Sequence, residues 1–396
     1  MSAMKYVILR GAATGPLESA GPAPRAGRPK GAGAPARLDI AVDDLDRRDV
    51  ARLSRTRGVS VAPVIPMKLI APVGRPKAVD AAAASTAWGV TAVGADTSPF
   101  SGDGIVVSIL DTGIDAAHPA FAGVDLVQQD FTGEGNGDEH GHGTHCAGTV
   151  FGRTVNDTRI GVATGVERVL IGKVLGARGG SSDQIVRAIQ WAVDGGATVV
   201  SMSLGMDFPG LVAELIDQDY PADIATSLAL EGYRTNVMLF ERLASLIRAQ
   251  GAFAPPTLLV AAAGNESRRG DNPDFEVAVA PPAVSEGMVS VAALAAGAQG
   301  FSVAPFSNVG ALVAGPGVSV TSARRGGGLV SMSGTSMATP HVAGVAALWA
   351  QKLKASNQLT TVNLMTRLVA SGATTGMVAG FDPVDVGAGM VRAPQD

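Results

Sequence analysis

The alternation of apolar runs and helical patterns from Ile105 onward limits the fold more than any other feature of the sequence. Because buried parallel strands carry continuous apolar runs and need helices on both faces, this alternation predicts an α/β fold with a mainly parallel central sheet. Ligands of such sheets bind beyond the carboxyl ends of the strands. The apolar runs lie at 105–111, 168–176, 197–205, 257–265 and 288–294, and a helical pattern spans 181–196.

A small appendage precedes this pattern. The chain of 396 residues has room for one large domain, which we place at 88–396, and for an α+β unit at 1–73. Residues 11–37 are rich in Gly, Ala and Pro and are predicted to be a loose excursion, and 74–87 has the composition of a linker. The elements expected in the appendage are a strand at 5–10, a helix at 43–58 and an extended segment at 59–73.

Charge separates the two parts. Residues 1–79 contain 14 Lys/Arg and 6 Asp/Glu, a net charge of +8, so the rest of a chain with net charge −4 carries −12. The basic part has no aromatic interleaving and no recognition-helix pattern, so we expect no nucleic-acid partner and attribute the asymmetry to attraction between the two parts.

The compartment can be inferred only in part from the sequence. No apolar run is long enough to span a bilayer, which predicts no membrane partner, and the start of the chain lacks the apolar core of a Sec signal. The literal sequence therefore predicts a cytoplasmic protein, although a secreted chain without its signal would look the same. A single cysteine, Cys146, rules out an internal disulfide.

Three of the five histidines, His140, His142 and His145, lie within six positions and suggest a metal site, a structural turn or a catalytic site. Their spacing matches no HExxH pattern and no second ligand cluster follows, so we predict no metal site. Two distant residues favour catalysis. Asp111 ends a buried strand, where a carboxylate needs a partner such as an imidazole N–H. Ser336 stands at the start of an apolar helix, where backbone N–H groups favour a developing anion.

Three motifs in order resemble the signature blocks of the subtilisin-like (S8, subtilase) serine proteases. They are DTGID at 111–115, HGTHCAG at 142–148 and GTSMATPHVAG at 334–344, and the second is closest to the proteinase K-like branch. The order Asp, His, Ser is the one known for subtilisin. The resemblance implies a three-layer subtilisin-like fold with a small α+β inhibitor-type prodomain in front of it.

The same resemblance implies a serine endopeptidase (EC 3.4.21) and gives each motif residue a role. Asp111 is the orienting carboxylate, His142 the general base and Ser336 the nucleophile. Asn265, in VAAAGNE, and the backbone N–H of Ser336 would form the oxyanion hole. By this match, the two neighbouring histidines are a structural residue and a loop residue, and Cys146 is buried beneath His142.

Substrate contacts are implied by two further stretches. SMSLG at 201–205 resembles the edge strand that pairs with the substrate backbone, and GARGGSS at 176–182 resembles the opposing strand with its Gly-rich rim. A peptide in extended conformation would add as a strand between them, which predicts broad specificity. The residues expected to bind substrate are Ser203, Leu204, Gly205, Gly179 and Gly180.

Two features depart from the family pattern. An insertion at about 206–256 follows the pocket strand. Its acidic residues either form a solvated face or give the pocket a preference for basic substrates, and they are Glu214, Asp217, Asp219 and Asp223. The loop 152–163 lacks the family's calcium-ligand pattern, and Ala120 stands where a ligating Asp is common. We therefore expect no required cofactor and no strong calcium site, with calcium at most a stabiliser.

The resemblance also implies that the protein is made as a self-inhibited zymogen. Residues 1–73 would be a prodomain that inhibits its own active site, and cleavage is expected near Ala81–Ser85 in the linker. Two alternative functions stay open, a peptide ligase or macrocyclase that uses the same acyl-enzyme and a catalytically silent peptide-binding module. A lipase-like α/β-hydrolase is disfavoured, because Ala338 stands where that fold needs Gly.

Overall fold

The computed structural model describes residues 4–11, 39–79, 85–251 and 254–396. Its largest sheet consists of β6 (Val106–Asp111), β7 (Asp125–Asp130), β8 (Arg168–Lys173), β10 (Val199–Met202), β12 (Leu258–Ala262), β13 (Met288–Gly297), β14 (Gly300–Val303) and β15 (Val313–Pro316). These strands are hydrogen-bonded in the order β14-β13-β12-β10-β6-β8-β7, with β15 also paired to β13. Each pairing is parallel except that of β13 with β14.

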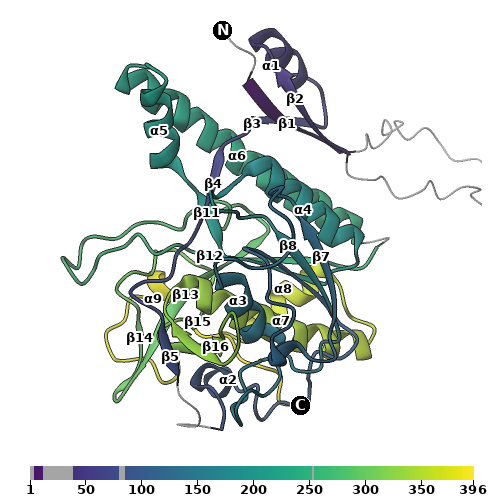
Figure 1. Ribbon diagram of the computed structural model, residues 1–396, viewed down its shortest axis with the longest axis vertical. Helices are drawn as coiled ribbons and strands as arrows, with labels where there is room; N and C mark the ends of the chain where they lie inside the picture. The colour runs from purple at the N-terminus through teal and green to yellow at the C-terminus, as the bar shows by residue number, and fades with distance from the viewer. Residues whose placement is uncertain (1–3, 12–38, 80–84, 252–253) are drawn as a thin grey trace, which may run out of the picture.

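Helices lie on both sides of this sheet (Figure 1). On one side are α3 (His142–Phe151) and α7 (Thr335–Ala355), and on the other are α4 (Ser182–Asp194) and α6 (Ala222–Gln250). The mainly parallel sheet between two helical layers confirms the α/β prediction. The shorter helices of the large domain are α2 (Trp88–Ala92), the 3₁₀ turn η1 (Pro119–Phe121), α8 (Thr361–Ala370) and α9 (Pro383–Val386).

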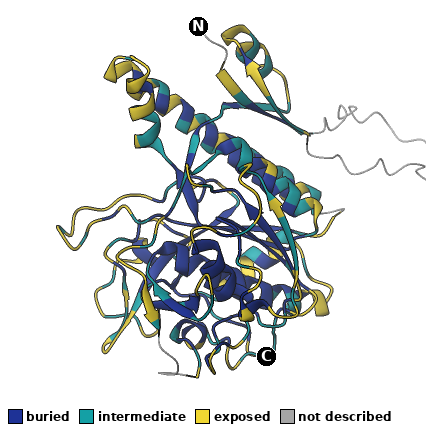
Figure 2. Ribbon diagram, in the orientation of Figure 1, coloured by how far each residue is buried: buried dark blue, intermediate teal, exposed yellow. Residues whose placement is uncertain are grey.

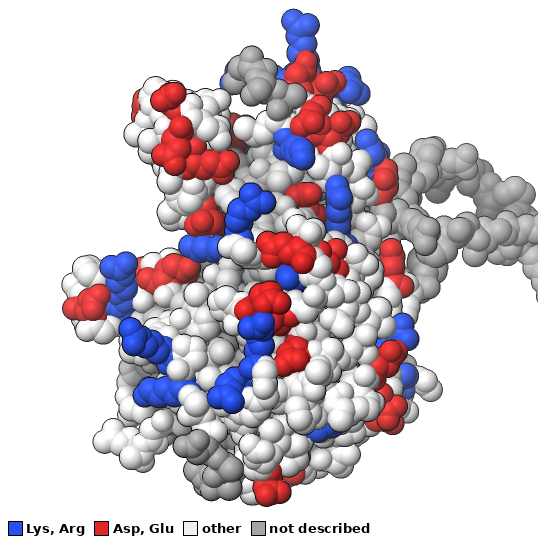
Figure 3. Space-filling model, viewed as in Figure 1, with Lys and Arg blue, Asp and Glu red and all other residues white. Residues whose placement is uncertain are grey.

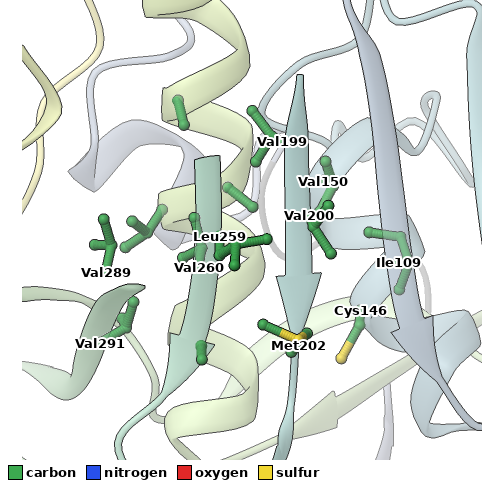
Figure 4. Close-up of a cluster of buried hydrophobic side chains, with 14 of the residues drawn as sticks. Ile109, Cys146, Val150, Val199, Val200, Met202, Leu259, Val260, Val289 and Val291 are labelled. Carbon is green, nitrogen blue, oxygen red and sulfur yellow. The ribbon is translucent and has the colours of Figure 1, made fainter. Parts of the chain in front are cut away.

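The core lies between the sheet and the pair α3 and α7. Both helices are buried over almost their whole length (Figure 2), and all ten residues of α3 are buried. Figure 4 shows valines of β10, β12 and β13 gathered with Val150 and Cys146 of α3. A small residue also lets α3 lie close to a strand outside the central sheet. A Cβ at Gly148 of α3 would lie 2.5 Å from the Oγ of Ser322, on β16 (Val320–Ala323).

The N-terminal unit is a three-stranded antiparallel sheet with one helix. It consists of β1 (Met4–Arg10), β2 (Asp39–Leu45), α1 (Arg47–Ser54) and β3 (Val59–Pro63), in the sheet order β2-β1-β3. The helix predicted over 43–58 begins later, because residues 43–45 pair with β1 and Asp46 caps α1 through its side chain. Of the predicted excursion 11–37, all but residue 11 lies outside the described residues.

The chain leaves this unit as a strand that joins the large domain. β4 (Pro66–Leu69) runs between β11 (Leu204–Met206) and β9 (Gly180–Ser181), antiparallel to both. β5 (Lys77–Val79) then pairs with β17 (Leu329–Met332), which also pairs with β16. Within the segment 74–87, which is predicted to be a linker, the backbone of residues 77–79 thus continues a sheet.

The insertion predicted at about 206–256 contains two helices, α5 (Phe208–Asp217) and α6, which form a projecting hairpin beside the N-terminal unit (Figure 1). The side-chain Nδ2 of Asn236, on α6, donates to the carbonyl oxygen of Pro63 at 2.8 Å. The hairpin, which follows β11 in the sequence, therefore contacts the N-terminal unit. In the described part of the chain, every helix is too short or too polar to cross a membrane.

Candidate active site

Asp111 and His142 meet at the carboxyl end of β6. Asp111 is the last residue of this strand and His142 is the first residue of α3, which follows Gly141 in the left-handed region at φ 90°. The two atoms Asp111 Oδ1 and His142 Nδ1 lie 2.7 Å apart, and both side chains are buried. Because a carboxylate only accepts hydrogen bonds, the Nδ1 of His142 carries the proton. This leaves Nε2 as the atom that can accept a proton from a nucleophile.

Asp138 fixes this geometry and is a positioning residue that the motif comparison missed. Its Oδ1 accepts from the hydroxyl of Thr112 at 2.9 Å and from the backbone N–H of Gly141 at 2.7 Å. Its Oδ2 accepts from both the N–H and the hydroxyl of Thr144. The carboxylate thus ties the loop after β6 to the first turn of α3. The sequence feature that could have indicated Asp138 is its place four residues before His142, inside the histidine-rich stretch.

The charge state of His142 reflects two opposing effects. Burial lowers the pKa of its imidazole, while the carboxylate of Asp111 and the thiol of Cys146 raise it, and the net result is a pKa well above 6.5. The Nε2 atom is buried and has no hydrogen-bond partner among the described residues. The imidazole of His142 is therefore fixed at Nδ1 by Asp111 and has a free acceptor at Nε2 among the described residues.

Ser336 stands in the first turn of α7, and its carbonyl oxygen has unusual donors. Pro340, four residues later, has no N–H, so the usual helical hydrogen bond to Ser336 is missing. The thiol of Cys146 donates instead, with Sγ 3.4 Å from this oxygen, and the hydroxyl of Ser203 donates at 3.3 Å. Cys146 is buried beneath His142, as predicted, with Sγ 3.7 Å from its Nδ1. Cys146 thus links His142 to the first turn of α7.

Asn265 follows β12, three residues beyond the last residue of that strand. Its Oδ1 accepts from the backbone N–H and from the hydroxyl of Thr335, each at 2.9 Å. These bonds orient the amide, and its Nδ2 donates to the carbonyl oxygen of Ala71 at 2.9 Å. The donor proposed for the oxyanion is thus positioned by the residue next to Ser336.

Residues 66–73, which we call the blocking segment, lie across the site. The N–H of Ile70 donates to the carbonyl of Ser203 at 3.3 Å, and the hydroxyl of Ser336 donates to the carbonyl of Ile70 at 2.7 Å. Beyond Ser336, the N–H of Val73 donates to the carbonyl of Ser333 at 2.7 Å. The segment occupies the groove in the extended form expected of a substrate.

The five residues predicted to bind substrate all contact this segment. The pairs across its two edges are Leu204 with Leu69, Gly205 with Lys68 and Gly180 with Met67, and Ser203 holds Ile70. Gly179 has a φ of +80°, and a Cβ there would lie 2.7 Å from the carbonyl oxygen of Met67. Only glycine allows the backbone to approach so closely.

Neither of the other two histidines of the motif shares a hydrogen bond with His142, although the ring of His140 packs edge-on against it with centroids 6.2 Å apart. His145 is buried and its Nε2 lies 3.0 Å from the carbonyl of Val320, and burial lowers its pKa to about 3, so it is neutral. His140 is exposed. In the described residues, the group with metal-ligand spacing is instead Asp111, His142 and Cys146, within 4.8 Å of one another. These side chains already hydrogen-bond to one another.

Two carbonyl oxygens of the loop 152–163 already have a donor within the chain. Calcium needs about six to eight oxygen ligands. Here two carbonyl oxygens of the loop, those of Gly161 and Val162, accept from the guanidinium of Arg159 at 3.2 Å each, and the same group donates to the carbonyl of Ala95 at 3.0 Å. The positively charged guanidinium of Arg159 therefore already hydrogen-bonds to these oxygens.

Comparison with known proteins agrees with this geometry. The model of the subtilase family matches residues 102–383. The chain is 32% identical over 274 residues to subtilisin-like protease 6 of Trichophyton rubrum, covering 66% of this chain and 57% of that protein. It is 33% identical over 270 residues to the thermostable alkaline protease of Halalkalibacterium halodurans, covering 66% and 62%. With the intracellular serine protease of Paenibacillus polymyxa, the identity is 32% over 277 residues, covering 68% and 74%. The match spans about three fifths of the first two relatives.

Proposed function

The chain belongs to the subtilase family of serine proteases, and from this premise we propose that it is a serine endopeptidase made as a self-inhibited zymogen. The observation that carries the proposal is the contact of the Ser336 hydroxyl with a peptide carbonyl, next to the Asp111–His142 pair. Asp111 orients the imidazole and stabilises the imidazolium that forms during reaction. Substrates would be peptides or proteins in extended conformation.

The proposed reaction passes through an acyl-enzyme. The Oγ of Ser336 attacks the peptide carbonyl carbon while its proton moves to the Nε2 of His142. The Nδ2 of Asn265 and the backbone N–H of Ser336 hold the oxyanion. His142 then gives the proton to the leaving amine, and the C–N bond breaks. Water, deprotonated by His142, attacks the ester carbonyl. The C–Oγ bond then breaks, His142 returns the proton to Oγ of Ser336, and the new carboxylate leaves.

The contacts of the blocking segment support self-inhibition rather than turnover. The hydroxyl of Ser336 donates to the carbonyl of Ile70, whereas Asn265 donates to the carbonyl of Ala71. The nucleophile and its oxyanion donor thus engage two different peptide groups. The hydroxyl proton of Ser336 is used in the bond to Ile70, and the Nε2 of His142 has no partner among the described residues. No single carbonyl of the segment therefore contacts both the Oγ of Ser336 and the Nδ2 of Asn265. We infer that the intact segment acts as an inhibitor in this register.

The site of processing stays a proposal. Of the region predicted to be cut, Ala81–Ser85, residues 81–84 lie outside the described residues. The carbonyls of Ile70 and Ala71 lie at the nucleophile and at the oxyanion donor. This favours a first cut after Ile70, whose carbonyl lies at the nucleophile, over a cut in the linker.

One incubation separates the candidate activities. The purified chain and its Ser336→Ala variant are mixed with an unfolded polypeptide, and the products are weighed by mass spectrometry. Fragments that sum to the substrate plus water, absent from the variant, support a protease. Joined fragments that have lost water would support a ligase, and binding without any new mass would support a silent peptide-binding module.

A further inference from the structure

A charged side chain of the blocking segment is held by two acids of the large domain. Lys68 pairs with Gly205 in the β4–β11 ladder, and its Nζ lies 3.4 Å from Oδ1 of Asp207 and 3.9 Å from Oε1 of Glu266. Its neighbours in the segment behave differently, since Met67 and Ile70 are each only 2% exposed. At the position of Lys68, the large domain presents two carboxylates to this strand.

The first acid, Asp207, is fixed by the backbone of the segment. Its N–H donates to the carbonyl of Pro66 at 3.1 Å, which extends the pairing of β11 with β4 by one residue. Its side chain also caps α5 by accepting from the N–H of Gly210. Any peptide paired with β11 in this register would therefore bring the side chain opposite Gly205 to this carboxylate.

The second acid, Glu266, is fixed by a buried amide. Asn308 is fully buried, and its Nδ2 donates to Oε2 of Glu266 at 2.9 Å while its Oδ1 accepts from the N–H of Glu266. This leaves Oε1, the other carboxylate oxygen, toward Lys68. Glu266 also follows Asn265 directly, so the acid is tied to the same turn that carries the oxyanion donor.

We propose that Asp207 and Glu266 form a subsite that selects lysine or arginine two residues before the residue whose carbonyl reaches Ser336. The inference rests on the proposed protease function and names a substrate preference for that site. The three side chains are 31–39% exposed, so water screens the pairing and its effect is moderate. An acidic residue of a substrate at this position would be repelled by the two carboxylates, which increases the preference for basic over acidic side chains.

The other acids of the insertion are a different surface. Figure 3 shows acidic side chains gathered over the tip of the α5–α6 hairpin. Glu214, Asp217, Asp219 and Asp223 are all exposed there, as a solvated acidic face would be. Two of them, Asp217 and Asp223, offer a matched control with the same loss of charge on the same insertion.

The test uses the full chain and three peptides that share the sequence Pro-Met-X-Leu-Ile, with a fluorescent amine as the leaving group after Ile. X is Lys, Gln or Glu. The leaving group fixes which bond is cut and therefore the register. Because all three peptides compete for the same open fraction of the enzyme, ratios of kcat/KM do not depend on how much chain retains its own segment.

We expect kcat/KM for the Lys peptide to exceed that for Gln by roughly 3- to 10-fold and that for Glu by about 10- to 30-fold at low salt. The ratios should shrink in high salt, because the acids are partly exposed. The double variant Asp207→Asn, Glu266→Gln keeps the hydrogen-bond acceptors and should bring the ratios near one. The control Asp217→Asn, Asp223→Asn should leave them unchanged.

Equal rates for the three peptides in the wild type would overturn the subsite while leaving the protease function intact. So would a preference that survives Asp207→Asn, Glu266→Gln but disappears in the Asp217→Asn, Asp223→Asn control, since the hairpin acids would then be the selecting surface. If none of the peptides is cut and Ser336 takes up no serine-directed reagent, the protease function itself fails and the subsite with it.

Discussion

The hydroxyl of Ser336 donates to the carbonyl oxygen of Ile70 at 2.7 Å, across 266 positions of the sequence. This bond uses the proton that the nucleophile would have to pass to His142. The chain therefore carries in its own blocking segment the group that holds its proposed nucleophile inactive. The roles of Asp111, His142 and Cys146 at this site, and of Arg159 in the loop 152–163, can each be measured separately.

Replacing Asp111 by Asn should lower kcat/KM for peptide hydrolysis by about 10⁴-fold, the scale known for the corresponding change in another serine protease. The amide can donate to Nδ1, which would then place the histidine's proton on Nε2, where it cannot accept one from the serine. Asp125→Asn, an exposed acid on β7, serves as the control and should keep full activity. A loss smaller than tenfold for Asp111→Asn would contradict the assigned role.

The raised pKa of His142 should appear in two pH profiles. A general base must be neutral, so kcat/KM should rise as pH increases through this pKa. The protonated form is favoured in the folded state, so its contribution to the free energy of unfolding is fully present below the unfolded value of about 6.5 and is lost as pH rises through the folded value. An NMR titration of the imidazole in Ser336→Ala checks this. A midpoint below 6.5 would count against the pairing.

Cys146 should react slowly in the folded chain. Burial raises the pKa of its thiol, so little thiolate forms, and the side chain is 1% exposed. Iodoacetamide should label it at least about 100-fold more slowly than in denaturant. Cys146→Ser keeps a donor toward the Ser336 carbonyl and should retain activity better than Cys146→Val. Rapid labelling of the native protein would place the thiol at the surface instead.

Removing calcium should not change the unfolding temperature, because the guanidinium of Arg159 already holds the carbonyls of Ala95, Gly161 and Val162. Arg159→Met should lower the free energy of unfolding by about 2 kcal/mol, since these partly buried oxygens lose a charged donor. Arg168→Met, which removes an exposed arginine paired with Asp125, is the control and should cost less than about 1 kcal/mol. A clear drop in unfolding temperature with a calcium chelator would reveal a site elsewhere.

The parallel sheet and the three proposed catalytic residues were accessible to sequence reasoning for a physical reason. Each catalytic residue sits at the end of a continuous apolar run or at the start of a helix, where local patterning places it at one edge of the sheet. Asp111 and His142 are close because β6 ends at Asp111, α3 begins at His142, and both ends lie at the same edge of the sheet. Asn265 could be placed in the same way after β12.

Contacts between distant segments were not accessible. The sheet formed by β4, β9 and β11 joins residues more than 100 positions apart, and no periodicity in 66–73 distinguishes a blocking segment from a linker. Asp207 and Glu266 become a pair only because Lys68 of the blocking segment lies between them in the folded chain. The loop 152–163 could be seen to lack a calcium-ligand pattern, but the three carbonyl partners of Arg159 depend on the folded turn.

Intact mass after treatment with a fluorophosphonate decides whether Ser336 is a nucleophile restrained by its own chain. The wild type, Ser336→Ala and Ile70→Asp are compared, the last because a charge in place of a buried side chain should displace the blocking segment. We expect one adduct on Ser336 in the wild type, faster labelling in Ile70→Asp, and none in Ser336→Ala. If Ile70→Asp remains folded and Ser336 stays unlabelled, the chain is not the serine protease proposed here.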